Sequence, residues 1–304
     1  MSYLNQFIYY TTLILFVFLS LQSVYLLVFA LAGRLVTLRK YKVAHRQGSF
    51  AIYIPAYKED GVIVDTAKAA LTLNYPAYRK HVIVIADSLQ PATLLALRGL
   101  PIQVIEVSFE KSTKAKALNI ALQKTAGEYD YALILDADNV CAKGFLYRMN
   151  DVLQSGFKVV QGQRVAKNTN TTFALLDAIS EGINNHIFRK GHRALGLSAA
   201  IIGSGMAIDF SLFKTIMPEI TAIGGFDKEL QLNLLHNHIY FGYAPKAIVY
   251  DEKIMQQSHF ENQRKRWLSA QFHYMRRYFF SGCFHLLKGN VNFFDNAIQT
   301  ALLP

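Results

Sequence analysis

Two carboxylates separated by one small residue, Asp136 and Asp138, follow directly on the apolar run 131–135. A short apolar run that ends in polar residues is typical of a buried central strand, and open α/β sheets bind ligands where such strands end. Two acids this close repel each other. A hard divalent cation, Mg²⁺ or Mn²⁺, would remove the repulsion and leave positions open for phosphate. The alternative is a solvated turn, because Asp-x-Asp-Asn is also good loop chemistry.

The elements that must position this pair are apolar runs that alternate with helical segments. Strands are predicted over residues 49–57, 81–87 and 102–107. Helices are predicted over residues 61–73, from residue 90 onward, and over residues 114–125. The first strand ends at Tyr57 with Glu59 just beyond it, the second ends at Asp87, and the third helix opens on Lys114. This alternation predicts an α/β fold with a mostly parallel central sheet and helices on both faces, so that the polar strand ends share one cleft.

The second half of the chain continues the pattern with fewer clear strands. Helices are predicted over residues 145–153 and 171–192 and in a segment ending near residue 238, and strands over residues 158–165, 199–208 and 246–250. The strand 199–208 passes through Gly203, Ser204 and Gly205. Glycines inside a strand usually mark a bulge or a close approach of the backbone to a ligand.

The amino terminus predicts a membrane anchor. Residues 7–32 contain no charged side chain, are long enough to cross a bilayer, and are preceded by no basic residue, which favours a retained anchor over a signal peptide. Basic residues follow at once: Arg34, Arg39, Lys40, Lys42 and Arg46. The positive-inside rule then places the rest of the chain in the cytoplasm, on the cell (inner) membrane. We expect an anchor (1–35), a basic linker (36–48), an α/β domain (49–255) and an interfacial helical segment (256–304).

The net charge of +11 favours anionic partners. Because the basic residues cluster near the anchor and near the carboxyl end, we expect anionic lipid and phosphate-bearing substrates as partners, and no nucleic acid. Residues 261–277 combine cations with aromatics at helical spacing, which predicts an amphipathic helix on the membrane surface with Phe272, Tyr274 and Tyr278 at the lipid boundary. The only two cysteines, Cys141 and Cys283, indicate neither a zinc site nor a disulfide.

Several motifs occur in a fixed order along the chain: Ile54-Pro-Ala-Tyr57-Lys-Glu59, Ile85-Ala-Asp87-Ser88, Lys114-Ala-Lys-Ala-Leu-Asn119, Asp136-Ala-Asp138, Gly203-Ser-Gly-Met206, Gly225-Phe-Asp227-Lys228 and Gln263-Arg-Lys-Arg266-Trp267. The ordered set resembles the membrane-bound glycosyltransferases of family 2, which include cellulose, chitin and hyaluronan synthases and have the nucleotide-sugar-binding fold called GT-A. The resemblance covers residues 49–278, and the Gln-x-x-Arg-Trp motif is its most specific part.

The resemblance implies a site for a nucleotide-diphosphate sugar, most readily a UDP-sugar. Asp87 would accept hydrogen bonds from the uracil or ribose, and Tyr57 would border the base with Glu59 close by. Asp136 and Asp138 would bind the diphosphate through Mg²⁺ or Mn²⁺, with Asp138 the more direct metal ligand. Such a cation would neutralise the charge that develops on the leaving nucleoside diphosphate.

Other residues of the motifs are implied in donor and acceptor binding. Lys114 would place a charge near the phosphates, although a solvated helix lysine is an equally good interpretation. Gln263 and Arg266 would contact the donor, because a guanidinium suits phosphate oxygens. Trp267 would face a sugar ring of the acceptor, together with the turn Gly203-Ser204-Gly205.

Asp227 is implied as the general base, because inversion at the anomeric carbon needs a carboxylate that takes the proton of the attacking hydroxyl. Phe226 stands where the common pattern has an acid, which leaves Glu229 as a less favoured substitute.

The implied function is inverting sugar transfer to a growing polysaccharide or a lipid-linked glycan. Two alternatives are transfer of a single sugar to a lipid, and an inactive membrane scaffold suggested by Phe226 and by the chain's stop at Pro304, before the further membrane helices that relatives usually carry.

Overall fold

The computed structural model describes residues 3–221 and 224–303 of the chain. It has an α/β fold around one sheet with the strand order β3-β2-β1-β4-β7-β6-β8-β5. The strands are β1 (Phe50–Tyr57), β2 (Lys80–Asp87), β3 (Gln103–Val107), β4 (Tyr131–Ile134), β5 (Val140–Cys141), β6 (Val159–Ala166), β7 (Met206–Asp209) and β8 (Phe241–Asp251). The pairs β1–β2, β1–β4, β2–β3 and β6–β8 are parallel, whereas β7 runs antiparallel to β4 and β6, and β5 antiparallel to β8. The predicted mostly parallel sheet is confirmed.

Helices cover both faces of this sheet, as predicted. The α-helices are α1 (Tyr3–Leu35), α2 (Ile63–Leu71), α3 (Pro91–Arg98), α4 (Lys114–Lys124), α5 (Phe145–Leu153), α6 (Thr172–Asn184), α7 (His192–Ala194), α8 (Phe210–Ile216), α9 (Phe226–His236), α10 (Gln257–Leu287) and α11 (Val291–Gln299). Short 3₁₀ helices η1 (Ala77–Arg79) and η3 (Met217–Glu219) and a π-helix η2 (Asn185–Gly191) complete them. The buried core on one face is closed by α2, α3 and α5, and that on the other by α4, α8 and α9.

One expectation from the sequence needs correction, and another is confirmed with a local irregularity. The strand predicted over residues 199–208 is regular only from Met206, because Gly203 and Gly205 have positive φ angles of 72° and 59° that a strand does not accommodate. The helix predicted over residues 171–192 continues through the π-helical turn η2. There the buried Arg189 bonds to Glu181 and Asn185 at 2.9 and 2.7 Å, so the polar residues of this segment tie helical turns together.

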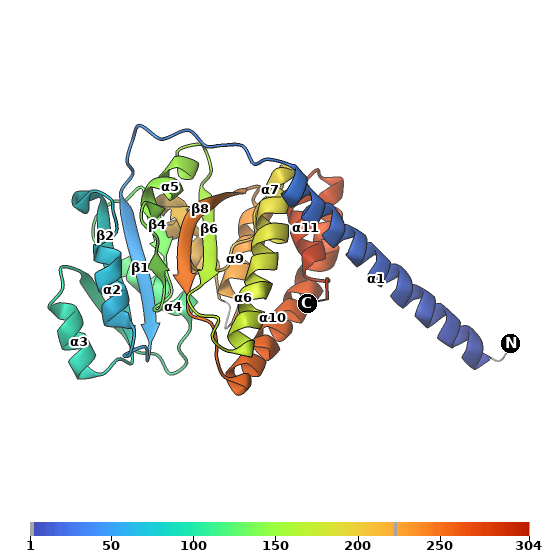
Figure 1. Cartoon of the computed structure of the whole chain (residues 1–304), viewed down its shortest axis with the longest axis horizontal. Coiled ribbons are helices and arrows are strands. Elements are labelled where there is room, and N and C mark those ends of the chain that lie inside the picture. Colours follow the sequence, from blue (N-terminus) through green and yellow to red (C-terminus); the bar gives the residue numbers. More distant parts are fainter. Residues whose placement is uncertain (1–2, 222–223, 304) are drawn as a thin grey trace.

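Helix α1 is, among the described residues, the one helix long and apolar enough to cross a membrane, with a mean hydropathy of 2.4. Figure 1 shows it leaving the body of the molecule, with only its last turns against α7 and the neighbouring helices. There the ring of Phe29 stacks on His192 with centroids 3.7 Å apart. The hydroxyl of Tyr25 donates to Asp295 of α11 at 2.7 Å. The carboxyl-terminal helix therefore helps to hold the base of α1.

Helix α10 is longer than predicted, and one of its aromatics lies differently from our expectation. Phe272 is exposed, but Tyr274 is buried and its hydroxyl donates to the carbonyl of Gly225 at 3.2 Å. Tyr278 is half-buried and packs edge-on against Phe293 of α11. Tyr274 therefore fixes α10 to the loop before α9 instead of facing outward.

Candidate active site

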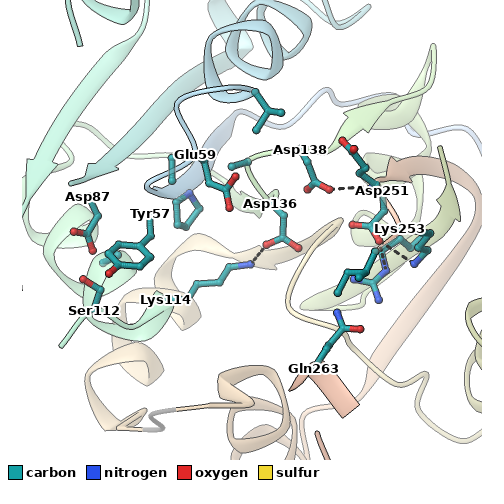
Figure 2. A pocket seen from close by; sticks show the side chains of 18 of the residues that line it. Tyr57, Glu59, Asp87, Ser112, Lys114, Asp136, Asp138, Asp251, Lys253 and Gln263 are labelled. Carbon is teal, nitrogen blue, oxygen red and sulfur yellow. Dashed lines mark hydrogen bonds and ion pairs between the residues drawn. The ribbon is translucent and has the colours of Figure 1, made fainter. Parts of the chain in front are cut away.

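A cavity of about 790 Å³ lies where β1, β2 and β4 end, between them and the start of α10. It collects side chains from widely separated parts of the chain, as Figure 2 shows. Of the residues predicted from the sequence, its wall contains Tyr57, Glu59, Asp87, Lys114, Asp136, Asp138, Gln263 and Trp267. The predicted convergence of polar strand ends on one cleft is therefore seen.

The acidic pair stands in the middle of this wall, and its two members have different partners. The ammonium of Lys114 bonds to Asp136 and donates to the carbonyl of Gly203 at 2.7 Å (Figure 2). Asp138 instead accepts hydrogen bonds from neutral donors, the amide of Asn139 at 3.1 Å and the backbone N–H of Glu252 at 3.0 Å. Lys114 thus compensates the charge of Asp136. Among the described residues no basic side chain pairs with the carboxylate of Asp138, and Lys167 bonds only to its backbone carbonyl.

The buried residue Asn139 shapes the pair, although we did not select it from the sequence. Its side-chain oxygen accepts from the backbone N–H of Asp136 at 3.1 Å and from the hydroxyl of Ser204. Its amide donates to Asp138 at 3.1 Å and to Asp251 at 3.2 Å. Its position directly after Asp138 in the sequence could have identified it as a site residue. Through these bonds it connects the turn after β4 with the end of β8.

The electrostatics of Asp138 suit a cation. Burial, followed by the charges of Asp251 and Asp136, raises the pKa of Asp138 to about 6. Glu59 also has a raised pKa, mainly through burial and then through Asp136 and Glu252. Among residues 3–221 and 224–303, no three His, Cys, Asp or Glu side chains form a ready-made metal site. The carboxylates therefore offer part of an oxygen ligand set that a diphosphate would have to complete.

The other end of the cavity can receive a nucleobase. Asp87 is buried and accepts a hydrogen bond from the hydroxyl of Ser88 at 3.0 Å, while its second oxygen accepts none from residues 3–221 or 224–303. Tyr57 is 51% exposed, so its ring is free to border a flat ligand. Figure 2 shows both side chains next to Ser112, at the opposite side of the pair from Asp251.

Helix α10 supplies the remaining side of the cavity. Gln263 lines the cavity, and its buried side-chain oxygen has no hydrogen-bond partner among the described residues. Trp267 lines the cavity and is 44% exposed. Arg266 is exposed and does not line the cavity. The structure thus brings together two of the three α10 residues that we selected.

The turn at Gly203 and Gly205 lies beneath the cavity. A side chain at Gly205 would come within 2.5 Å of Val249, which is incompatible with any larger residue. Gln161 of β6 holds the turn by donating to the carbonyl of Ser204 at 2.9 Å. Ser204 is itself fully buried and bonds to Asn139, so the turn supports the acidic pair from below. Acceptor binding by this turn stays a prediction.

Asp227 and Glu229 lie in different surroundings at the start of α9. Asp227 is half-buried and does not line the cavity. It lies beside Gly203: a Cβ atom placed on that glycine would be 3.2 Å from the Cβ of Asp227. Burial raises the pKa of Asp227, and the backbone N–H of Lys228 and the charges of Lys114 and Lys228 act in the opposite direction. Glu229 is buried and accepts from the backbone N–H of Thr221 at 3.0 Å. Asp227 thus lies beside the Gly203 turn and Glu229 is held by the backbone, and the role of either as the base stays a prediction.

A buried cluster of charges, which we did not predict, forms the wall beyond Asp138. It consists of Arg164, Asp177, Glu181, Arg189, Asp251, Lys253 and Arg264. Lys253 bonds to Asp251 at 2.9 Å, and Glu181 accepts from Arg164 at 2.6 Å. Opposed charges this well paired can remain buried. Asp251 could have been selected from the sequence, because it directly follows a predicted strand. No sequence pattern marks its partners on α6.

Two solved structures are similar to this chain in fold. A mannosyltransferase from Pyrobaculum calidifontis, PcManGT, solved in complex with GDP-Man and Mn²⁺, has a TM-score of 0.62 at 15% identity, over 85% of this chain and 73% of its own. TarS of S. aureus (residues 1–349), solved in complex with UDP-GlcNAc, has a TM-score of 0.47 at 17% identity, over 70% of this chain and 60% of its own. No curated protein sequence matches.

The family itself is established by the sequence. The family model described as "Glycosyltransferase like family 2" matches residues 46–270, which is most of the chain and includes every predicted site residue. The chain is therefore a glycosyltransferase with the GT-A fold and belongs to the glycosyltransferase-like family 2.

Proposed function

We propose that this protein transfers a sugar, with inversion, from a nucleoside-diphosphate donor to a hydroxyl of a lipid-linked or growing glycan. The observation that carries the proposal is the single cavity that joins Tyr57 and Asp87 at one end, the acidic pair in the middle, and Gln263 and Trp267 of α10 at the other. Its ends can accommodate a nucleobase and a sugar, with the charged diphosphate between them.

Asp136 and Asp138 would hold a divalent cation, Mg²⁺ or Mn²⁺, on the diphosphate. The raised pKa of Asp138 supports this assignment, because a nearby cation relieves the repulsion from Asp136 and Asp251. A Mn²⁺ ion accompanies GDP-Man in the structure of the similar mannosyltransferase. Such an ion would supply Lewis-acid stabilisation of the leaving diphosphate.

The reaction itself would use the chain's own groups for positioning and for the proton. The acceptor hydroxyl attacks the anomeric carbon, the bond from that carbon to the diphosphate oxygen breaks, and Asp227 takes the hydroxyl proton. The raised pKa of Asp227 makes its carboxylate a better base. Lys114 bonds to Asp136 and to Gly203, so its charge can move onto the phosphates when the donor binds.

The exposed surface of α6 supports a location against a membrane. Its buried side carries Asp177 and Glu181, whereas Leu175, Leu176, Ile179 and Ile183 are between 47% and 51% exposed. A helix with its charges inside and its aliphatic residues outside is suited to lipid. Together with the apolar α1, this favours a catalytic domain at the cytoplasmic surface of the cell membrane, with α1 as the anchor.

The decisive experiment incubates the full-length protein in detergent with radiolabelled UDP- and GDP-sugars, with and without Mn²⁺, and a lipid extract as acceptor source. We expect cation-dependent transfer that Asp138→Asn and Asp227→Asn each reduce by more than about 100-fold. Asp151→Asn, on α5 and outside the cavity, is the control. A parent with neither transfer nor cation-dependent nucleotide binding would establish the scaffold alternative, and the length of the labelled product distinguishes polymer synthesis from single-sugar transfer.

A further inference from the structure

The buried charge cluster reaches from the acidic pair to the only tryptophan of the chain. The first contacts, from Asp138 to Lys253, lie under the cavity. Asn139 donates to both Asp138 and Asp251, at 3.1 and 3.2 Å, and Asp251 accepts from Lys253 at 2.9 Å. The ammonium of Lys253 is in turn 3.6 Å from Asp177 of α6, and the Lys253 side chain is only 2% exposed.

The last contacts join α6 to α10. The carboxylate of Asp177 accepts from the guanidinium of Arg264 at 3.1 Å. That guanidinium lies over two rings of its own helix, 4.8 Å from the centroid of Phe260 and 4.7 Å from that of Trp267. Phe260 is also in contact with Phe173 of α6, with ring centroids 5.6 Å apart.

These contacts give Arg264 a fixed place. A guanidinium has no single preferred position beside an aromatic ring on an exposed helix surface, but here the ion pair to a buried carboxylate determines it. The Asp177 side chain is 8% exposed and the Arg264 side chain 30%. The indole of Trp267, which is 44% exposed, therefore has one face against a cation that is tied to α6.

We infer that Asp177 and Arg264 are positioning residues that set the indole of Trp267 for a sugar ring of the acceptor. Asp177 also lines the wall of the cavity, whereas Arg264 does not. Asp177 acts through Arg264, and Arg264 acts through the ring of Trp267. The acceptor part of this inference rests on the proposed glycosyl transfer, whereas the orientation of the indole does not.

Because Trp267 is the only tryptophan, its fluorescence reports on this arrangement directly. In Arg264→Gln, Asp177 keeps its contact with Lys253, so no buried charge is left alone. We expect a shifted emission maximum and stronger quenching by acrylamide in Arg264→Gln, in Asp177→Asn and in the double variant, with no further change in the double variant. Arg264→Lys, which retains the charge but not the planar group, should show an intermediate shift.

Enzyme assays then test the consequence, with octyl β-glucoside as the acceptor probe and the donor found active for the parent. We expect KM for octyl glucoside to rise about fivefold in Arg264→Gln, as befits one cation–π contact, while KM for the donor and kcat stay unchanged. Lys265→Gln is the matched control, because Lys265 is an exposed cation on the same helical turn and does not line the cavity. It should change neither fluorescence nor kinetics.

Two results would overturn the inference. One is a Trp267 emission and quenching profile in Arg264→Gln and Asp177→Asn that equals that of the parent, whatever the activity. The other is an equal rise in both KM values, or a fall in kcat alone, in variants whose melting curves match the parent's. A parent that transfers no sugar would refute the proposed function, but the fluorescence comparison would still decide whether the indole is positioned in this way.

Discussion

At the scale of single residues, the two acids after β4 have different surroundings. Asp136 already has a cation in Lys114, whereas Asp138 is surrounded by amide donors and by Asp251. A bound cation would therefore relieve the most repulsion at Asp138. This agrees with the sequence-based expectation that Asp138 is the more direct metal ligand, which stays a prediction until binding is measured.

Asn139 provides a first test of this arrangement. Asn139→Ala removes the bonds to the backbone of Asp136 and to Asp138 and Asp251, so we expect cation affinity to fall by about 10- to 100-fold and stability by about 2 kcal/mol. Calorimetric titration with Mn²⁺ in the presence of UDP measures the first effect. Asn237→Ala, at the exposed end of α9, is the control, and equal affinities in the two variants would contradict the assignment.

The pKa of Asp138 predicts a second effect. Because the folded-state pKa is raised to about 6, above an unfolded value near ~3.9, the carboxylate destabilises the cation-free fold above pH 6, and this penalty disappears as the pH falls below 4. Asp138→Asn should therefore stabilise the protein in EDTA by about 2 kcal/mol at pH 8, and progressively less towards pH 4. Urea unfolding at several pH values measures this difference. A variant that is less stable than the parent at pH 8 would show that Asp138 is compensated without a cation.

At the scale of elements, α6 holds the far wall of the cavity through Glu181. Burial by itself would raise the pKa of this carboxyl, but Arg164, Arg189 and Lys253 together lower it to about 2. The contribution of the Glu181 carboxylate to the free energy of unfolding is therefore present at neutral pH and is lost as the pH falls from about 4 towards 2. Three cations from β6, η2 and the segment after β8 thus converge on one side chain.

Glu181→Gln should accordingly lower the free energy of unfolding by about 3–5 kcal/mol at pH 7, because it leaves buried cations without their carboxylate. The difference from the parent should be smaller at pH 3. Urea unfolding followed by circular dichroism gives both numbers. Glu106→Gln, which breaks the exposed pair with Arg98, is the control and should cost less than about 1 kcal/mol. Similar losses in the two variants would mean that the cluster is no more important than a surface ion pair.

The same elements show what the sequence could predict. Strands β1, β2 and β4 were recognisable because each is a short apolar run that ends in a polar residue, and a parallel sheet must bring those ends together. The charge cluster was not recognisable. Asp177 and Arg264 are 87 positions apart, and only the packing of α6 beside α10 makes them partners. Gly203 and Gly205 were read as part of a strand, because the sequence does not reveal that their φ angles are positive.

At the scale of the whole molecule, the apolar features lie together at one end. Figure 1 shows α1 extending from the same side that carries α6, α10 and α11, while α3 lies at the opposite end of the sheet. The exposed aliphatic residues of α6 share this side with exposed Phe280 and Phe284 of α10. We therefore predict that a bilayer crossed by α1 contacts the outer surfaces of α6 and α10, the helix whose Trp267 lines the cavity.

Trp267 allows this orientation to be measured in vesicles that contain brominated phosphatidylcholine, which quenches indoles near the acyl chains. We expect quenching in the reconstituted full-length protein, and a clear loss of quenching in Leu176→Asp/Ile179→Asp, because each charged residue on the exposed aliphatic side of α6 opposes contact with the bilayer. Leu95→Asp makes the same chemical change at a 73% exposed leucine of α3, at the far end of the sheet, and should leave quenching unchanged. If Trp267 is not quenched in the parent, or if Leu95→Asp reduces quenching as strongly as the α6 variant, the domain does not lie against the membrane through α6, and α1 alone determines any membrane contact.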